Sequence, residues 1–316
     1  MKLNLHLLRV FHTVVKEGSF SAAARELHIS QPAVSKAVSE LERQLDLVLI
    51  ERGGTRPGQG MGLTEAGRSL QEHARAIFAL EHAAVAELQA RSGLKRGELV
   101  IGASTTIAGY WLPRYLQKFA QRWPDILIKV VAANTQAIVE DLYDCHLDLA
   151  LVEGPVHKQG VAYYPWKEER LAIIGSPADF APSAANPALL GRRTGLGGKA
   201  ITVSRSTLQD CTWLMREHGS GTGEVTARWL SMLHIKPQRS IEIGSNEGMA
   251  RGVASGLGVA MLPVAVVDDL LQLGRVVELR VSDMPGLSRP LYRLERKDRP
   301  ASHAVQAFLD ILSRPV

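Results

Sequence analysis

Residues 19–45 constrain this chain more than any other stretch, because they predict two short amphipathic helices joined by a tight turn. Ser19 is placed to cap the first helix, which runs to Leu27. Ser30 is placed to cap the second, and Pro32 falls in its first turn, where a missing N–H costs little. The apolar residues of the second helix recur every three or four positions and share one buried face: Val34, Val38, Leu41 and Leu45.

The opposite face of this second helix is polar and carries Gln31, Ser35, Lys36 and Ser39. Short polar side chains with one cation are the groups that read base edges and contact phosphates in a DNA major groove. The alternative is an ordinary helical hairpin with a solvated face. A preceding apolar helix, ended by Gly18, favours DNA reading because it completes a three-helix core. Its apolar stripe comprises Leu5, Leu8, Phe11, Val14 and Val15.

Residues 1–68 resemble the winged helix-turn-helix of LysR-type transcriptional regulators, through the pattern FxxVxxxGSFSAAARxLxxSQPAVSxxxxxLExxL followed by LTEAG. The glycine-rich run 53–62 predicts the wing hairpin. Ile50 stands where the family usually has Phe, and the wing is several residues longer than usual. The resemblance implies that the helix approaches the bases and that the wing approaches the phosphate backbone. The expected DNA-contacting residues are Ser19, Ser21, Gln31, Pro32, Ser35, Lys36, Arg52 and Arg56.

Composition agrees with a regulator of this kind, because the formal net charge of +5 weakly favours a polyanionic partner. No stretch approaches the length of a membrane span, and the amino terminus lacks the apolar core of a signal peptide, which predicts a cytoplasmic protein. The two cysteines, Cys145 and Cys211, fit no metal or CxxC spacing and are interpreted as structural thiols. A redox switch linking them is the alternative. No metal or cofactor is expected.

A long helix is predicted over residues 64–92, which contain no proline and whose apolar positions recur near heptad spacing. About 27 residues span roughly 40 Å at 1.5 Å per residue. Such a stripe is suited to pairing with the same helix of another subunit, and the alternative is that it packs on its own chain. The resemblance implies a homodimer through this linker helix and a homotetramer, so that paired heads read two half-sites.

The remaining residues alternate strands and helices, which predicts an α/β sheet with helical crossovers. We expect a DNA-binding domain at 1–63, a linker helix at 64–92 and an effector domain at 93–316. Within the last, one subdomain is expected at about 97–166 and 273–316, with Val276–Val281 and Leu291–Arg296 resuming its sheet, and a second at about 167–272. A chain that leaves one subdomain and returns must cross twice, which makes a hinged cleft.

This half resembles the periplasmic-binding-protein-like effector domain of LysR-type regulators, so the chain as a whole is predicted to be an α+β multidomain protein. The matching segments are GASTTIAGYWLP, LVEGP, REHGSGTG and GSNEGMARGVASGLGVAMLP. Together they look most like the CysL/YeiE branch, with relatives among the carbon-fixation regulators. Resemblance to that branch implies that the effector is a small sulfur oxyanion.

Polar residues at strand-to-helix turns independently suggest an anion site, because hydroxyls and free N–H groups converge at helix starts. Such residues are also ordinary helix caps. The expected effector-binding residues are Ser104, Thr105, Thr106, Glu153, Ser220, Gly221, Thr222 and Asn246. Glu153 would repel an anion unless it is turned away, paired or protonated. Relatives often carry Arg where this chain has Gly223, so a small hydrogen-bonded oxyanion is favoured over a sugar phosphate, although other arginines could reach the cleft. A small carboxylate or a phosphorylated metabolite is the alternative.

Two other functional classes fit the sequence less well. An enzyme would need a nucleophile with its base, a metal cluster or a cofactor loop, and neither HxxxH, GxGxxG nor GxxxxGK[ST] occurs. A solute-binding protein for a transporter would have the effector half but would not need residues 1–92. We therefore predict a non-enzymatic regulator that binds promoter DNA and a small anionic effector. RNA polymerase is a further expected partner, and a membrane is not.

Overall fold

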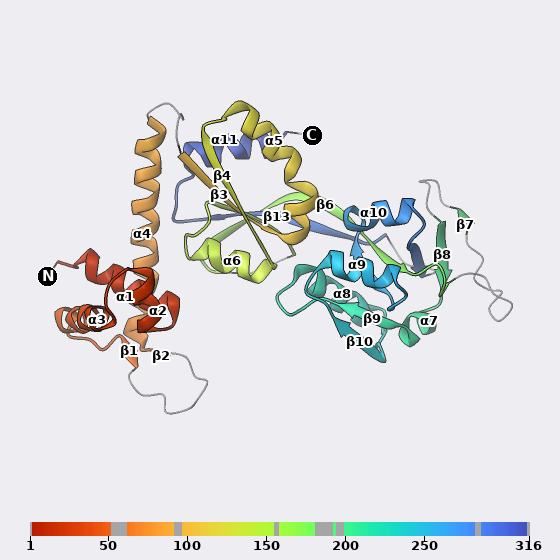
Figure 1. Ribbon diagram of the computed structural model, residues 1–316, viewed down its shortest axis with the longest axis horizontal. Helices are drawn as coiled ribbons and strands as arrows, with labels where there is room; N and C mark the ends of the chain where they lie inside the picture. Colours follow the sequence, from red (N-terminus) through yellow and green to blue (C-terminus); the bar gives the residue numbers. More distant parts are fainter. Residues whose placement is uncertain are drawn as a thin grey trace. The chain divides into compact units, whose positions relative to one another are not determined.

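The computed structural model describes residues 2–51, 62–91, 97–154, 158–180, 192–193, 199–281 and 286–314. The chain divides into two compact units, Met1–Val85 and Ala86–Val316, whose helices and strands are labelled in Figure 1.

Three helices form the amino-terminal unit, and each begins at a side-chain cap. Asn4 caps α1, and the Ser19 and Ser30 hydroxyls accept N–H groups at the starts of α2 and α3, as predicted. Gly18 ends α1 in the left-handed conformation. The buried faces meet in one core that includes Phe11, Ala23, Val34, Val38 and Leu41. The bounds are α1 Leu5–Glu17, α2 Phe20–Glu26 and α3 Gln31–Leu45.

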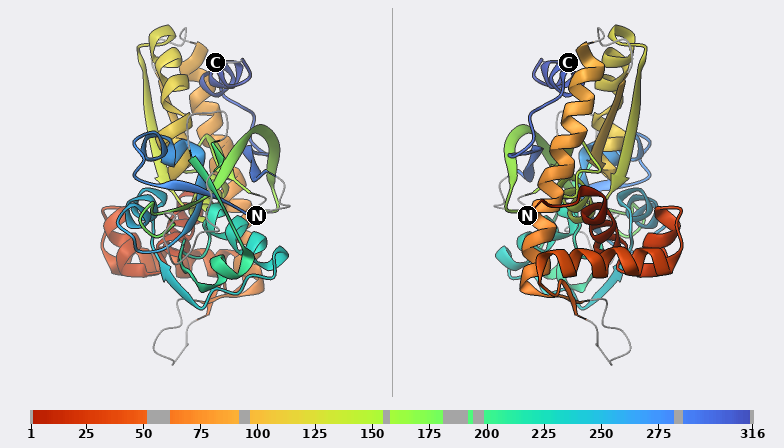
Figure 2. Two further views of the ribbon diagram at one scale, coloured as in Figure 1. Left: turned by 90° about the vertical axis from the view of Figure 1, so that its right-hand side faces the viewer. Right: turned by 90° about the vertical axis from the view of Figure 1, so that its left-hand side faces the viewer.

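The base of the predicted wing is present as two antiparallel strands, β1 (Ile50–Glu51) and β2 (Gly62–Leu63). The long helix α4 (Glu65–Arg91) follows directly, with the predicted length of 27 residues. Gly67 lets α4 approach the wing base, because a Cβ at this position would lie 2.0 Å from the carbonyl oxygen of Leu49. Figure 2 shows α1–α3 gathered around one end of α4.

The apolar stripe of α4 is buried in the first half of the helix and exposed in the second half. Its first half packs on its own chain, where Ala74 is fully buried and Leu70, Ile77 and Phe78 cover the three-helix core. Arg9 of α1 stacks on Phe78 at 4.5 Å and pairs with Glu81 at 2.5 Å. The second half exposes Leu80, Val85 and Leu88, with 60%, 49% and 69% of their surface accessible. Both interpretations of the stripe are therefore compatible with the structure, each for a different part of the helix.

Unit 2 contains two α/β halves, which we call subdomain I and subdomain II (Figure 1). In subdomain I, parallel strands lie between α5 and α11 on one face and α6 on the other. A short π-helix, η1, precedes α5 and continues directly into it. The bounds are β3 Gly97–Ser104, η1 Ile107–Trp111, α5 Pro113–Arg122, β4 Ile126–Ala133, α6 Thr135–Tyr143, β5 Leu149–Glu153 and α11 His303–Leu312.

Subdomain II repeats the layered arrangement, with α7 and α8 on one core and α9 and α10 on the other. Among the described residues, β9 and β10 form a separate parallel pair that a bridge between Trp213 and Val259 joins to the segment leading into β11. The bounds are β7 Arg192–Arg193, β8 Lys199–Val203, α7 Arg205–Asp210, β9 Thr212–Met215, α8 Gly221–Met232, β10 Arg239–Glu242, α9 Asn246–Ala254, β11 Ala260–Pro263, α10 Val264–Gln272 and β12 Val277–Val281.

Two antiparallel strands cross between the subdomains, β6 (Val161–Gly175) and β13 (Ser288–Arg296). The first part of β6 pairs with β13, and its last part pairs with β11 and β12. The expectation that the strand at Val276–Val281 returns to the first subdomain is wrong, because β12 pairs with β8 of subdomain II. The expectation for Leu291–Arg296 is confirmed, because β13 pairs with β5 of subdomain I. The pairing of β13 with β6 places Arg289 directly opposite Glu169 on the crossing strands.

Candidate functional site

The candidate DNA-reading surface is the outer face of α3. Gln31, Pro32 and Lys36 are exposed, and Ser35 is half-buried beside them. This arrangement follows from the helical period, because Val34, Val38 and Leu41 occupy the inner face. The start of the helix therefore presents its first-turn residues outward.

The other predicted DNA contacts fall around this helix. Ser21 is exposed near the start of α2, whereas Ser19 is half-buried and its hydroxyl accepts the Ala22 N–H at 3.4 Å. Arg52 and Arg56 lie outside the described residues. The contact of all these residues with DNA stays a prediction.

The predicted effector residues of subdomain I lie where β3 ends. Ser104 and Thr106 are buried, with 2% and 0% of their surface exposed, and Thr105 is half-buried. The Ser104 hydroxyl accepts the Ile107 N–H at 3.4 Å, so it caps the following π-helix. Thr106 accepts a hydrogen bond from the Asn246 amide of subdomain II at 2.7 Å. Capping and a cross-cleft contact are therefore both present in this short turn.

The predicted residues of subdomain II lie at the start of α8. Ser220 caps the helix by accepting the Gly223 N–H at 3.4 Å. Gly221 allows close approach of the two subdomains, because a Cβ there would lie 2.6 Å from the carbonyl oxygen of Glu153 in subdomain I. The Gln136 N–H also donates across the boundary to the Gly219 carbonyl at 3.1 Å. The strand-to-helix turns of the two subdomains therefore meet face to face.

Asn246 joins the two turns from the first residue of α9. It is fully buried, and its amide nitrogen donates to Thr106 of subdomain I at 2.7 Å and to Thr222 of subdomain II at 3.2 Å. Its oxygen accepts a hydrogen bond from Arg216 at 3.0 Å. Thr106, Thr222 and Asn246 are thus brought into one buried polar cluster, which together with the residues bonded to it we call the cleft cluster. The printed side-chain bonds of Ser104 and Ser220 go instead to backbone N–H groups at helix starts.

Arg289 of β13 is the central cation of the cleft cluster, and sequence reasoning missed it. Its side chain is 1% exposed, and it donates to Glu169 at 2.6 and 2.8 Å, to Glu153 at 3.2 Å and to Thr222 at 2.8 Å. The cleft therefore contains a strong cation although Gly223 supplies none, because Arg289 of the crossing strand β13 lies within it. Of the three alternatives for Glu153, the structure shows the paired one.

Glu169 and Trp111 complete the cluster and were also not singled out from the sequence. The Trp111 indole donates to Glu169 at 2.7 Å, and Thr135 donates to Glu153 at 3.1 Å. Burial raises the pKa of Glu169 above its ordinary value more than the neighbouring Arg289 lowers it. The sequence did not mark this pair, because Glu169 is one of four consecutive charged residues in β6 and Arg289 is one of four charged residues in β13.

Arg216 forms a second charge pair, which a hydrogen bond to Asn246 joins to the cleft cluster. Its guanidinium donates to both oxygens of Glu217 at 2.8 Å. Burial alone would raise the pKa of Glu217, but these hydrogen bonds hold it below its ordinary value, so the carboxylate stays charged. Arg216 lies in the REHGSGTG segment, which therefore carried a signal for a cation near the cleft.

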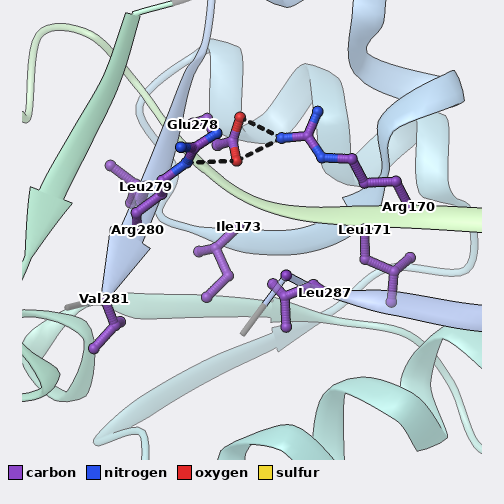
Figure 3. A pocket seen from close by; sticks show the side chains of 9 residues that line it. Arg170, Leu171, Ile173, Glu278, Leu279, Arg280, Val281 and Leu287 are labelled. Carbon is purple, nitrogen blue, oxygen red and sulfur yellow. Dashed lines mark hydrogen bonds and ion pairs between the residues drawn. The ribbon is translucent and has the colours of Figure 1, made fainter. Parts of the chain in front are cut away.

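A separate cavity of about 260 Å³ lies in subdomain II (Figure 3). Arg170 donates to both oxygens of Glu278 at 2.7 Å, and Arg280 donates to the same carboxylate at 3.1 Å. Leu171, Ile173 and other apolar side chains of the core lie beside these charges. None of the predicted effector residues lines this cavity, so it is distinct from the cleft cluster.

The two cysteines belong to different subdomains, since Cys145 follows α6 and Cys211 ends α7. Burial raises the pKa of both thiols above the ordinary value, which disfavours the reactive thiolate. No group of three metal-ligating side chains occurs among the described residues, and none of the helices described is long and apolar enough to cross a membrane.

Comparison with known proteins agrees with the geometry. Residues 92–314 match the LysR substrate binding domain, and residues 5–68 match the bacterial regulatory helix-turn-helix protein, lysR family. The Escherichia coli (strain K12) protein described as an uncharacterized HTH-type transcriptional regulator, YeiE, is 32% identical over 98% of this chain and 97% of its own. The Bacillus subtilis (strain 168) HTH-type transcriptional regulator CysL is 31% identical over 83% of this chain and 81% of its own.

Among solved structures, a full-length OxyR from Pseudomonas aeruginosa has the same fold, with a TM-score of 0.68 at 23% identity over 99% of this chain and 95% of that one. The predicted α+β multidomain fold is confirmed by this likeness and by the two matched domains. The helix-turn-helix match favours a regulator over a solute-binding protein or an enzyme. The chain therefore belongs to the LysR family of DNA-binding transcriptional regulators, with an effector-binding domain following its helix-turn-helix.

Proposed function

We propose that this regulator responds to a small oxyanion, sulfite-like in size and charge, that binds between the two subdomains. The observation that carries the proposal is the convergence of hydroxyl, amide and guanidinium donors from both subdomains in the cleft cluster. A ligand that accepts hydrogen bonds from both subdomains binds the closed arrangement better than the open one, so its binding favours closure. The proposed ligand-contacting residues are Ser104, Thr105, Thr106, Glu153, Ser220, Gly221, Thr222 and Asn246.

Arg289 strengthens the case for an anion of low charge. A buried guanidinium binds an oxyanion through parallel hydrogen bonds, and here it already contacts Thr222, one of the proposed ligand-contacting residues. The site is compact, since Thr106, Thr222 and Asn246 are each at most 2% exposed. A bulky ligand would have to hold these walls far apart, which favours a small oxyanion over a larger phosphorylated metabolite.

On DNA, we propose that Gln31, Pro32, Ser35 and Lys36 approach base edges from α3, and that Ser19 and Ser21 contact the backbone. The wing arginines, Arg52 and Arg56, are proposed to bind phosphate. The exposed apolar residues of the second half of α4 are proposed to pair with a second copy, giving a cytoplasmic homodimer that assembles further into a homotetramer. RNA polymerase is a proposed partner at the promoter.

The proposed mechanism is that effector-linked closure of the cleft changes the relative placement of subunits and so the spacing of the paired reading heads. A thermal-shift panel on the full-length protein tests the ligand class, with sulfite, sulfate, thiosulfate, phosphate and small carboxylates as probes. A ligand of the closed cleft raises the melting temperature with its concentration. Footprints on a DNA fragment selected by binding should then differ with and without that anion. Stabilisation by none of the oxyanions, or identical footprints, would contradict the proposal.

A further inference from the structure

The cleft cluster contains more buried carboxylates than its central cation can pair. Glu153 and Glu169 are 3% and 2% exposed, and both contact the single guanidinium of Arg289. Arg216 does not supply the missing charge, because Glu217 takes both of its parallel hydrogen bonds. An anion that enters this cleft therefore meets Glu153, an acidic side chain that shares its cation with a second acid.

The two carboxylates differ in how many donors they already have. Glu169 accepts one hydrogen bond from Trp111 and two short ones from Arg289, so both of its oxygens are engaged at 2.8 Å or less. Glu153 accepts longer bonds, one from Arg289 at 3.2 Å and one side-chain bond from Thr135 at 3.1 Å. A carboxylate offers about four lone-pair sites. Glu153 is therefore the acceptor with capacity left for a ligand.

We infer that Glu153 makes the cleft select an oxyanion that carries an acidic proton, and makes it reject one that carries none. This inference rests on the proposed function, since it concerns the same anion site. A ligand O–H donates to the Glu153 carboxylate and forms a short, charge-assisted hydrogen bond, while its remaining oxygens accept from Thr222 and Arg289. A fully deprotonated anion has only acceptors to place against this carboxylate, and like charges repel in a buried site.

The other groups around Glu153 do not provide an alternative proton. Thr135 of α6 and Arg289 of β13 already donate to Glu153. Glu169 of β6 has its oxygens on Trp111 and Arg289, so it is not placed to donate a proton to Glu153. The proton that separates the ligand from Glu153 therefore comes with the ligand.

Phosphate and sulfate provide the matched pair of probes, because they are tetrahedral and similar in size, but only phosphate carries a proton between about pH 6 and pH 8. We expect calorimetry on the full-length protein at about pH 6 to show phosphate binding at least about tenfold tighter than sulfate. Phosphate keeps at least one proton throughout this range, so its preference over sulfate should persist at both ends of it. Glu153→Gln should bring the two affinities together.

The matched control is Glu224→Gln, an exposed glutamate on α8 close to the same cleft wall, which should leave the preference unchanged. Sulfate binding as tight as phosphate in the wild type, or an unchanged preference in Glu153→Gln, overturns the inference and leaves the proposed function standing. If sulfite, thiosulfate, phosphate and sulfate all fail to bind either protein, the proposed function itself is overturned. The preference of the wild type for phosphate over sulfate tests the inference even if Glu153→Gln does not fold.

Discussion

Gly221→Ala should open the cleft between the two subdomains. The added Cβ would lie 2.6 Å from the Glu153 carbonyl oxygen and 3.0 Å from the Thr135 hydroxyl, both on the opposite wall. Backbone oxygen cannot move aside as a flexible side chain can, so the walls must separate. Overpacking of this kind costs about 1–3 kcal/mol. Since 1.4 kcal/mol corresponds to tenfold, the closed state should lose about 5- to 150-fold in population relative to the open one.

Hydrogen exchange at Gln136 measures this opening directly, because its N–H donates across the boundary to the Gly219 carbonyl. Mass spectrometry of the peptide containing Gln136 should show exchange that is faster in Gly221→Ala by the same factor. Gly223→Ala is the control, since the three atoms nearest to its Cβ belong to Arg216 and Glu217 of its own subdomain, at 3.3 to 3.4 Å. Equal exchange rates in the two variants would show that Gly221 does not set the approach of the walls.

Three further predictions concern DNA, assembly and pH. Gln31→Ala or Ser35→Ala should weaken operator binding by about 1–3 kcal/mol in a mobility-shift titration while random DNA is bound almost as before, and equal losses on both would refute direct reading. Leu88→Glu should lower the oligomer's mass in light scattering, because it places charge on an exposed apolar part of α4; an unchanged mass would place the contact elsewhere. Burial raises the pKa of the Glu169 carboxyl, so above pH 4.5 the folded protein holds a proton on Glu169 more tightly than the unfolded chain does. The free energy of unfolding therefore falls as pH rises and this proton is lost. The stability advantage of wild type over Glu169→Gln should therefore shrink from about pH 5 to pH 8 in urea titrations, and an advantage that grows would mean that the ionised pair with Arg289 dominates.

The amino-terminal unit could be predicted almost completely from the sequence because its signals are local. Ser19, Ser30 and Gly18 mark helix ends through hydrogen bonds within a few residues, and the structure shows the same caps. The apolar period of α3 determines which residues face outward, so the candidate reading surface followed from spacing alone. The first half of α4 was less predictable, because its stripe looks the same whether it covers its own core or another subunit.

The cleft was predictable only where its residues lie in strand-to-helix turns. Thr106, Thr222 and Asn246 were found this way, and the structure brings all three together. Arg289 and Glu169 were missed because they lie within strands, and their meeting depends on the register of β13 against β6. That register is set by long-range pairing, which one sequence does not reveal. The prediction that β12 belongs to the first subdomain was wrong for the same reason, because its pairing with β8 is also long-range.

The wing base packs closely on α4 at Gly67, and the three-helix core packs on the first half of the same helix, so these parts are expected to move together with α4. The helix has 27 residues and is therefore roughly 40 Å long. A tilt of about 5° over that length swings one end by about 3.5 Å. DNA rises by about 3.4 Å per base along each strand. A tilt of this size is thus enough to move the helix-turn-helix by one base-pair step along DNA.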